Sequence, residues 1–158
     1  MLAVLVELAD PAAEESRLLL CAHEDEMAAR YPTERWAGTT GRKDAFWVAR
    51  GDDGHAVGCV ALRVLAPVLV EVKHLYVEPA ARRAGVARVL MDALEAEARR
   101  RHSGIVLETG IEQPEAVALY RSRGYQDRDR YEECDVDGEG SVYLERLAGC
   151  AQYGDTVR

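Results

Sequence analysis

Apolar residues recur along this chain at two spacings, and each spacing predicts one kind of secondary structure. Short runs that contain aliphatic or aromatic residues and are bounded by turn residues are typical of strands. The sequence has seven such runs: Leu2–Leu8, Ala45–Arg50, Ala56–Val64, Val68–Val77, Ile105–Thr109, Tyr125–Asp127 and Ser141–Leu147. Residues 51–54 read Gly-Asp-Asp-Gly, which predicts a hairpin between the second and third runs.

Three other segments have helical patterning. The clearest spans Gly85–His102 and is followed by Gly104, a typical helix stop. Its apolar positions recur at four-residue spacing: Val86, Leu90, Leu94 and Ala98. Two more helices are expected at Pro11–Arg30 and Pro114–Arg123, each with a proline in its first turn. In the first of these, the positions expected to face inward include Leu18, Leu19 and Met27.

This order of elements predicts a single α/β (α+β) domain covering residues 1–158. Its core would be a twisted, mixed sheet of six or seven strands, with mostly antiparallel pairing. Only the helix at 85–102 is a long crossover, so only the strands on either side of it need to lie parallel. Residues 33–44 are expected to form a loop or a short helix, which would bring the number of helices to about four.

Composition narrows the class of protein. The chain has 158 residues, of which 48% are hydrophobic and 30% charged, as in a folded globular domain. Its uncharged runs are far shorter than the ~20 residues of a membrane span, and the first nine residues lack the basic start of a signal peptide. The four cysteines form no C-x-x-C pair and have no zinc spacing, which predicts reduced thiols in a cytoplasmic protein without a metal.

Charge is spread unevenly along the sequence. The net charge is −8, which disfavours nucleic acid and anionic membranes as partners. Residues 82–101 nevertheless hold six arginines against three carboxylates. A basic segment in an acidic protein indicates either a site for one anionic ligand or a solvated helix surface.

The most informative stretch joins the fourth strand to the long helix. After the strand comes Arg82-Arg83-Ala84-Gly85-Val86-Ala87, an Arg-x-x-Gly-x-Ala sequence at a helix start. Free amides at a helix N-terminus bind anions, and the helix dipole adds to the attraction. Gly85 has no Cβ to hinder a phosphate, Ala87 keeps the first turn slim, and the two arginines add positive charge. The loop is therefore a candidate phosphate site.

Together with the run 116–125 (Ala-Val-Ala-Leu-Tyr-Arg-Ser-Arg-Gly-Tyr), this loop resembles the GCN5-related N-acetyltransferase (GNAT) superfamily. Residues 107–116 are similar to one bacterial branch of it. The strong motifs cover residues 71–125, and the element order agrees over roughly residues 1–147. The resemblance implies acetyl-CoA as cosubstrate and an acetyl group transferred to an amine.

The resemblance also assigns roles to residues. The backbone of Leu75, Tyr76 and Val77 would pair with the pantetheine arm beside a strand bulge, and the amide near Leu75 would hold the thioester carbonyl. Residues 83–87, beside Arg82, would take the pyrophosphate. Tyr120 matches the family tyrosine that points at the CoA sulfur. Gln113 stands where many members have asparagine beside the cofactor arm, so the resemblance leaves its role open.

Acetyl transfer to an amine also needs a proton acceptor, because only a neutral amine attacks and a lysine-like amine has a pKa of ~10.4. Glu71 occupies the position where some family members carry their general base. His74 and Glu108 are the other candidates, acting directly or through water. Tyr120 could supply the proton that the leaving thiolate needs.

The sequence therefore predicts an acyltransferase that moves acetyl from acetyl-CoA to a primary amine of a small-molecule or peptidyl acceptor, by direct attack in a ternary complex. A catalytically silent CoA-binding sensor is the alternative. A nucleic-acid-binding module built on the arginine-rich helix is a further rival that the acidic remainder of the chain disfavours. A homodimer is common in families of this kind, and the sequence leaves that state open.

The first 35 residues carry eight carboxylates against three arginines. In families that resemble this one, the first helix and the following loop border the acceptor pocket. An acidic rim at Glu24, Asp25 and Glu26 would attract cationic amines. Tyr31, Arg35 and Trp36 are expected to line the entry, although a solvated helix face would explain the same charges.

Overall fold

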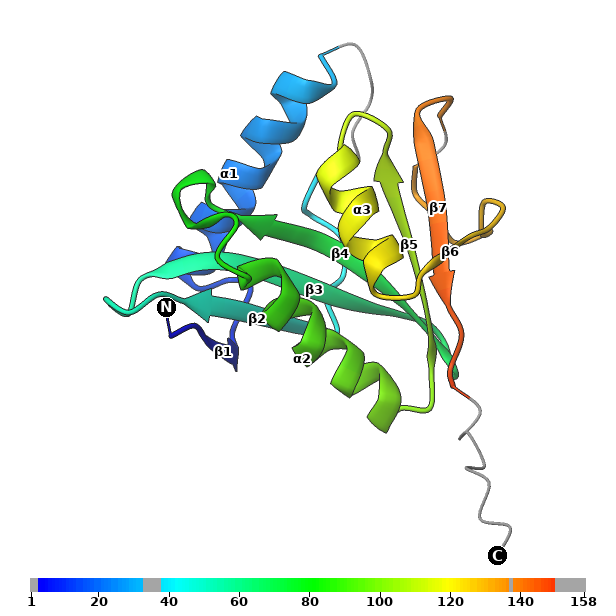
Figure 1. Cartoon of the computed structure of the whole chain (residues 1–158), viewed down its shortest axis with the longest axis horizontal. Coiled ribbons are helices and arrows are strands. Elements are labelled where there is room, and N and C mark those ends of the chain that lie inside the picture. Colours follow the sequence, from blue (N-terminus) through cyan, green and yellow to red (C-terminus); the bar gives the residue numbers. More distant parts are fainter. Residues whose placement is uncertain (1–2, 33–37, 137, 150–158) are drawn as a thin grey trace, which may run out of the picture.

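The computed structural model describes residues 3–32, 38–136 and 138–149, and it contains one seven-stranded sheet (Figure 1). The strands lie in the order β1-β2-β3-β4-β5-β7-β6. Their bounds are β1 Leu5–Leu8, β2 Ala45–Arg50, β3 Ala56–Ala66, β4 Leu69–Val77, β5 Gly104–Gly110, β6 Gln126–Asp127 and β7 Ser141–Arg146. Pairing is antiparallel except between β4 and β5, which flank the long crossover helix, so the predicted mixed sheet is confirmed.

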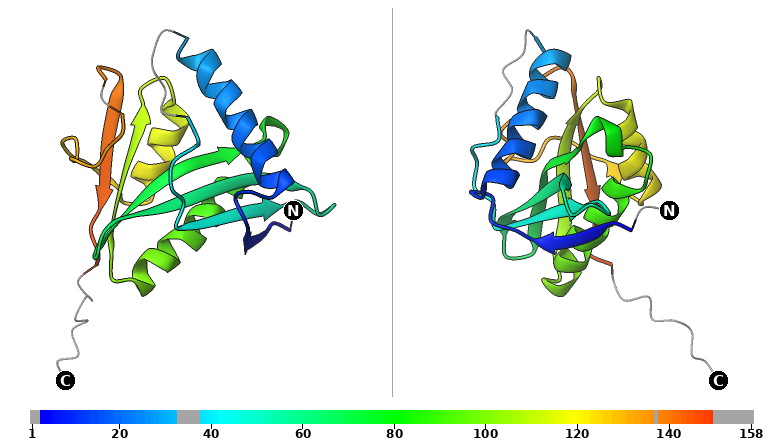
Figure 2. Two further views of the ribbon diagram at one scale, coloured as in Figure 1. Left: turned by 180° about the vertical axis from the view of Figure 1, so that it is seen from behind. Right: turned by 90° about the vertical axis from the view of Figure 1, so that its left-hand side faces the viewer.

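Helices cover both faces of this sheet (Figure 2). The described part of the chain has three α-helices, α1 Glu14–Arg30, α2 Val86–Arg100 and α3 Pro114–Ser122, and one 3₁₀ turn at Pro79–Ala81. The predicted stripe of α2 packs with α3 on one face, in the main core cluster. Leu19 and Leu20 of α1 pack on the other face, against Phe46, Val48 and Cys59.

The first helix departs from the sequence expectation in two ways. It begins at Glu14 rather than Pro11, because the side chain of Asp10 accepts the amide hydrogen of Ala12 at 2.8 Å and forms a turn ahead of the helix. Leu18, expected to face inward, is 65% exposed. The buried positions of α1 are Ser16, Leu19, Leu20, His23 and Met27. At 100° per residue, Leu18 points away from this stripe.

The sheet opens between β4 and β5. Their parallel pairing covers only Leu69–Glu71 against Gly104–Val106, at one end of both strands. Further along β4, the register with β3 shifts by one residue around His74, whose φ is +56°. This is the bulge that the family resemblance implies, and it breaks strict alternation. Val72, Leu75 and Val77 therefore all pack in the core cluster that contains α2, although a regular strand would place Val72 and Val77 on opposite faces of the sheet.

Two further sequence expectations concern the chain as a whole. Cys59 and Cys134 are free and buried, whereas Cys21 is free and exposed; Cys150 lies outside the described residues. Within residues 3–32, 38–136 and 138–149, no helix is long and apolar enough to cross a bilayer.

Candidate active site

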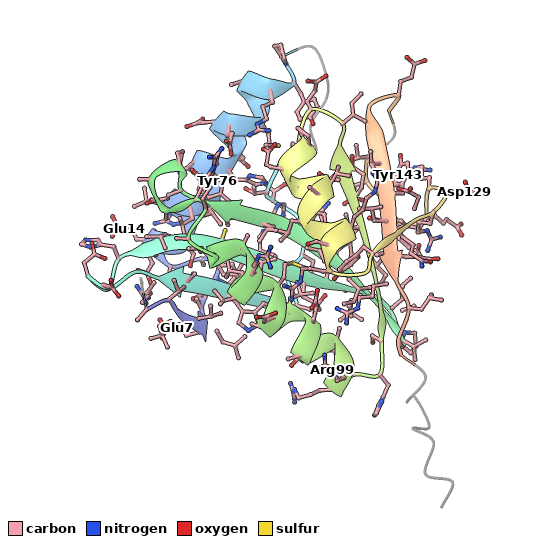
Figure 3. All side chains as sticks on the ribbon, viewed as in Figure 1. Glu7, Glu14, Tyr76, Arg99, Asp129 and Tyr143 are labelled. Atoms are coloured by element: carbon pink, nitrogen blue, oxygen red, sulfur yellow. The ribbon has the colours of Figure 1, made fainter. Side chains whose placement is uncertain are left out.

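A groove of about 600 Å³ lies where the ends of β4, α1 and α3 meet the start of α2. Most of the residues that the sequence assigned to a cofactor line it: Leu75, Tyr76, Val77, Arg82, Arg83, Gly85, Val86, Ala87 and Gln113. Ala84 belongs to the same loop but is outside the lining. Tyr76 lies at the end of β4 beside α1 (Figure 3). The fold therefore gathers the predicted binding residues around one elongated site.

The start of α2 presents donors to this groove. Gly85 is the N-cap residue and adopts a left-handed conformation with φ of +81°. The first backbone hydrogen bond of the helix is donated by Val89 to the carbonyl of Gly85, so the amides of Val86, Ala87 and Arg88 precede the helical ladder. A Cβ on Gly85 would meet no protein atom within 4 Å, which leaves open space beside these donors. The arrangement suits an anionic group.

The sequence places Arg82 beside the pyrophosphate, but in the structure its side chain contacts other parts of the protein. The Nε of Arg82 donates to the carbonyl of Val77 at 2.8 Å, and its Nη2 lies 2.8 Å from the carboxylate of Glu26. Its guanidinium also sits 5.8 Å from the centre of the Tyr76 ring. Arg82 thus ties the loop to β4 and α1. Arg83 and Arg88 also line the groove, and no salt bridge joins either to a described residue.

A second cavity of about 100 Å³ continues from the groove into the opening between β4 and β5. The two cavities share part of their lining: His23, Leu75, Gln113 and Ala116. The inner one adds four chemically active side chains: Lys73, His74, Glu108 and Tyr120. We call this space the inner cavity. It brings together three of the sequence candidates, Tyr120, His74 and Glu108.

Tyr120 is almost completely buried, and its ring packs edge-on against Tyr125 at 5.6 Å. None of the described residues hydrogen-bonds its hydroxyl. Burial raises the pKa of Tyr120 well above its ordinary value, and the negative charge of Glu108 raises it further. The phenol is therefore protonated at neutral pH and can donate a hydrogen bond into the inner cavity.

Glu108 reaches the inner cavity from β5, next to the gap in the sheet. Ser141, at the start of β7, donates its hydroxyl hydrogen to Glu108 Oε1 at 2.8 Å. This carboxylate is half-buried and oriented by its neighbour, while it still faces the space beside Tyr120. Its placement fits a group that accepts a proton inside the cavity.

The histidines of this region are neutral. Burial lowers the pKa of His74 to about 3, with Lys73 and Lys43 adding to the effect, and burial lowers the pKa of His23 to about 4. Their rings lie 6.2 Å apart, on β4 and α1. A group with so low a pKa accepts a proton poorly near neutral pH, so His74 fits the role of a general base less well than Glu108.

The low pKa values of these two histidines predict that the folded protein loses stability in acid. Because the unfolded chain protonates histidine near pH 6.5 and the folded chain does not, the free energy of unfolding should decrease as the pH falls below about 6.5. The slope should reach about 1.4 kcal/mol per pH unit for each histidine. Denaturant unfolding between pH 7 and 5 measures it. His23→Asn and His74→Asn should each flatten the slope, whereas His55→Asn, at an exposed site in the β2–β3 turn, should leave it unchanged.

Glu71 lies apart from these groups. It is only 1% exposed, and among the described residues the lining of neither cavity includes it. Tyr131 donates its hydroxyl hydrogen to Glu71 Oε2 at 2.5 Å, and Arg63 Nε lies 2.9 Å from Glu71 Oε1. The geometry therefore gives Glu71 structural partners and does not support the catalytic role expected from its sequence position.

Two of the three residues of the expected acidic rim, Glu24 and Glu26, have partners within the protein. Glu24 accepts hydrogen bonds from the amide and hydroxyl of Thr39, at 2.8 and 2.5 Å. Glu26 lines the groove and pairs with both Arg82 and Arg30. Asp25, the third residue of the expected rim, is exposed. The preference for cationic acceptors stays a prediction.

Of the three residues expected to line the entry of the acceptor pocket, the structure describes Tyr31. Tyr31 packs directly against Gly110 at the end of β5, because a Cβ on Gly110 would lie only 1.8 Å from the Tyr31 hydroxyl. The same hydroxyl accepts a hydrogen bond from the side-chain amide of Gln113 at 3.5 Å. Arg35 and Trp36 lie outside the described residues.

Sequence reasoning missed several residues of this site. His23 follows the buried spacing of Leu19, Leu20 and Met27, so the helical pattern could have placed it inward. Ser141 is 33 residues from Glu108 and gave no signal, because only the pairing of β5 with β7 brings the two together.

Comparison with known proteins identifies the family. A family model described as an acetyltransferase (GNAT) domain matches residues 42–127, more than half of the chain. The chain therefore belongs to the GNAT acetyltransferase family. It is 41% identical over 85 residues to an IAA acetyltransferase of Azospirillum brasilense. The aligned region covers 52% of this chain and 55% of that protein. The chain spans about half the length of the curated relatives it matches.

Solved structures agree with this family. A candidate acyl-CoA N-acyltransferase from Klebsiella pneumoniae shares 30% identity and a TM-score of 0.77, over 92% of this chain and 98% of that one. A GNAT acetyltransferase from Elizabethkingia anophelis, solved with acetyl-CoA bound, shares the fold at 16% identity. Its TM-score is 0.66, over 91% of this chain and 97% of that one.

The start of α2 offers a direct test of cosubstrate binding. Gly85→Val should weaken CoA binding by about 10–100-fold, because a branched side chain would fill the space beside the free amides and disturb charge-assisted hydrogen bonds. Calorimetry measures the dissociation constant. Gly54→Val is the matched control, since Gly54 has the same φ of +81°, open surroundings and a place in the distant β2–β3 turn. Equal CoA affinity in both variants would place the anion site elsewhere.

Proposed function

We propose that this chain transfers the acetyl group of acetyl-CoA to the nitrogen of a primary amine, by direct attack within a ternary complex. The observation that carries the proposal is the junction of two cavities, one beginning at the amides of α2 and one holding Tyr120 and Glu108. A long groove for the cosubstrate thus continues into a small chamber for chemistry. The acetyl-CoA bound to the Elizabethkingia relative supports the choice of cosubstrate.

In this proposal the two ends of the groove bind different parts of acetyl-CoA. The amides of residues 86–88 bind the pyrophosphate, and Arg83 and Arg88 add positive charge. The backbone of Leu75, Tyr76 and Val77 lies alongside the pantetheine arm, and the amide near Leu75, next to the bulge at His74, holds the thioester carbonyl. Bound acetyl-CoA supplies the acetyl group as a reactive thioester. Positioning and electrostatic stabilisation provide most of the acceleration.

Glu108 is the proton acceptor in this proposal, directly or through one water. It is the carboxylate that lines the inner cavity beside Tyr120, whereas Glu71 is enclosed by Arg63 and Tyr131. Tyr120 donates a hydrogen bond toward the sulfur that departs. Glu108 thus takes the proton at the amine, and Tyr120 stabilises the negative charge that develops on the sulfur.

Charges of both signs line the inner cavity, because Lys73 and Glu108 both belong to its lining. Lys73 favours the neutral form of an amine bound beside it, which is the nucleophile, and Glu108 accepts the proton that the amine loses. We propose as acceptor a primary amine of a small molecule or of a peptide, with a cationic acceptor as one case that the amine panel tests.

A panel of amines tests the proposal. Release of CoA from acetyl-CoA is followed with small amines, amino acids and lysine peptides, and products are checked by mass spectrometry for acetyl on nitrogen. Turnover with at least one acceptor class is the expected result. Tight CoA binding with no turnover across the panel would favour the alternative, a CoA-binding sensor. Failure to bind CoA would exclude both functions.

A further inference from the structure

Glu71 belongs to a buried network that the reaction described above does not use. Tyr131 donates a hydrogen bond to one carboxylate oxygen at 2.5 Å, and Arg63 Nε lies 2.9 Å from the other oxygen as an ion pair without hydrogen-bond geometry. The side chain of Arg63 is 15% exposed and that of Glu71 only 1%. Removing one partner of such a pair leaves a buried charge without compensation, so breaking the pair destabilises the structure around it.

Arg63 extends this network to the segment 131–136, which lies between β6 and β7. Its Nη1 pairs with Asp135 at 2.8 Å, and its Nη2 donates to the carbonyl of Glu133 at 2.9 Å. One guanidinium therefore joins the middle of the sheet to two points of this segment. Tyr131 supplies a third connection, because its hydroxyl reaches Glu71 from the start of the same segment.

The segment ends at the inner cavity. Val136 is part of the lining that includes Tyr120 and Glu108. Its carbonyl accepts hydrogen bonds from the hydroxyl of Tyr143 at 3.3 Å and from the thiol of Cys134 at 3.4 Å. Lys73, which also lines the cavity, lies 4.0 Å from Asp135. The position of this wall thus depends on groups that contact Arg63 and Glu71.

We propose that Glu71 is a positioning residue that, through Arg63 and Tyr131, fixes the 131–136 segment as the acceptor-side wall of the inner cavity. This inference depends on the proposed function in one respect: acetyl transfer identifies the molecule at the wall as the acceptor amine. The groove for the cosubstrate lies against α1, α2 and α3 instead. Loosening the wall should therefore weaken binding of the amine and leave binding of CoA unchanged.

Two variants test this role. Glu71→Gln removes the charge at the centre of the network, and Asp135→Asn removes its half-exposed outer partner without leaving a buried charge. Both should raise the KM of the amine about tenfold, in line with loss of one charged contact, with kcat reduced less than threefold. The Kd of CoA and the pH dependence of kcat should match those of the wild type. Asp127→Asn, which removes the exposed Arg121–Asp127 pair, is the control and should change neither constant.

Amide hydrogen exchange provides a readout independent of turnover. Exchange in residues 131–136 should accelerate in both variants, while α2 remains protected as in the wild type. Unchanged protection of this segment would overturn the proposal, even if no acceptor amine were known. A fall in kcat of two orders of magnitude in Glu71→Gln, with a lost basic limb in the pH profile and an unchanged KM, would make Glu71 the proton acceptor instead. Wild-type enzyme that acetylates no amine would refute the proposed function alone.

Discussion

Replacing Glu108 with glutamine is expected to lower kcat by about 10²–10³-fold at neutral pH while the Kd of CoA stays within twofold. Glutamine keeps the shape of the side chain and its hydrogen bond with Ser141, so the inner cavity should retain its form. What the variant loses is a group able to accept the proton of the attacking amine. Steady-state kinetics and calorimetry measure the two constants separately.

The pH dependence of this defect distinguishes proton transfer from a structural fault. As the pH rises toward the pKa of the amine, more of the acceptor arrives already neutral and the need for a protein base declines. The ratio of wild-type to variant rates should therefore shrink at high pH. An acceptor of low pKa should show a smaller defect at neutral pH for the same reason.

Glu112→Gln is the matched control for Glu108→Gln. It neutralises an exposed carboxylate four residues along the chain, outside the lining of both cavities in the described structure. Its rate should equal that of the wild type. A constant rate ratio for Glu108→Gln at every pH, or equal loss in both variants, would show that Glu108 does not take the proton.

The binding half of the site could be predicted from sequence because its determinants are local. An arginine-rich loop, Gly85 and the apolar stripe of α2 follow one another within twenty residues, and each has a direct physical reading. Nine of the residues assigned to the cosubstrate lie around one groove, and their binding role stays a prediction. The ion pair of Arg82 could not be predicted in this way, because its partner Glu26 lies 56 residues earlier in the sequence.

The catalytic half depends on long-range geometry that local patterns do not contain. Glu71 and Glu108 are both strand carboxylates, and sequence offers no means of telling which one faces the cavity. The choice follows from where β4 and β5 stop pairing and from the bulge at His74. Glu71 lies in the paired part of the sheet and is enclosed, whereas Glu108 lies beyond it, where the strands have separated.

The raised pKa of Tyr120 defines what this residue can do for the leaving group. Burial and the charge of Glu108 both favour the protonated phenol. A thiol has a pKa of about 8.5, below that of even an unperturbed tyrosine, so complete transfer of the phenolic proton to a thiolate is unfavourable. Tyr120 should therefore act chiefly by donating a hydrogen bond that strengthens as negative charge develops on the sulfur.

Tyr120→Phe is accordingly expected to lower kcat by about 10–100-fold and to leave the Kd of CoA nearly unchanged, because the ring and its packing remain. Rapid-quench measurement of a single turnover isolates the chemical step from product release. Tyr125→Phe is the matched control: it removes a second buried hydroxyl, which contacts Glu95 at 3.2 Å away from both cavities. That variant should lose stability and keep its rate. If Tyr120→Phe kept the wild-type rate with chemistry limiting, Tyr120 would be a residue of the core alone.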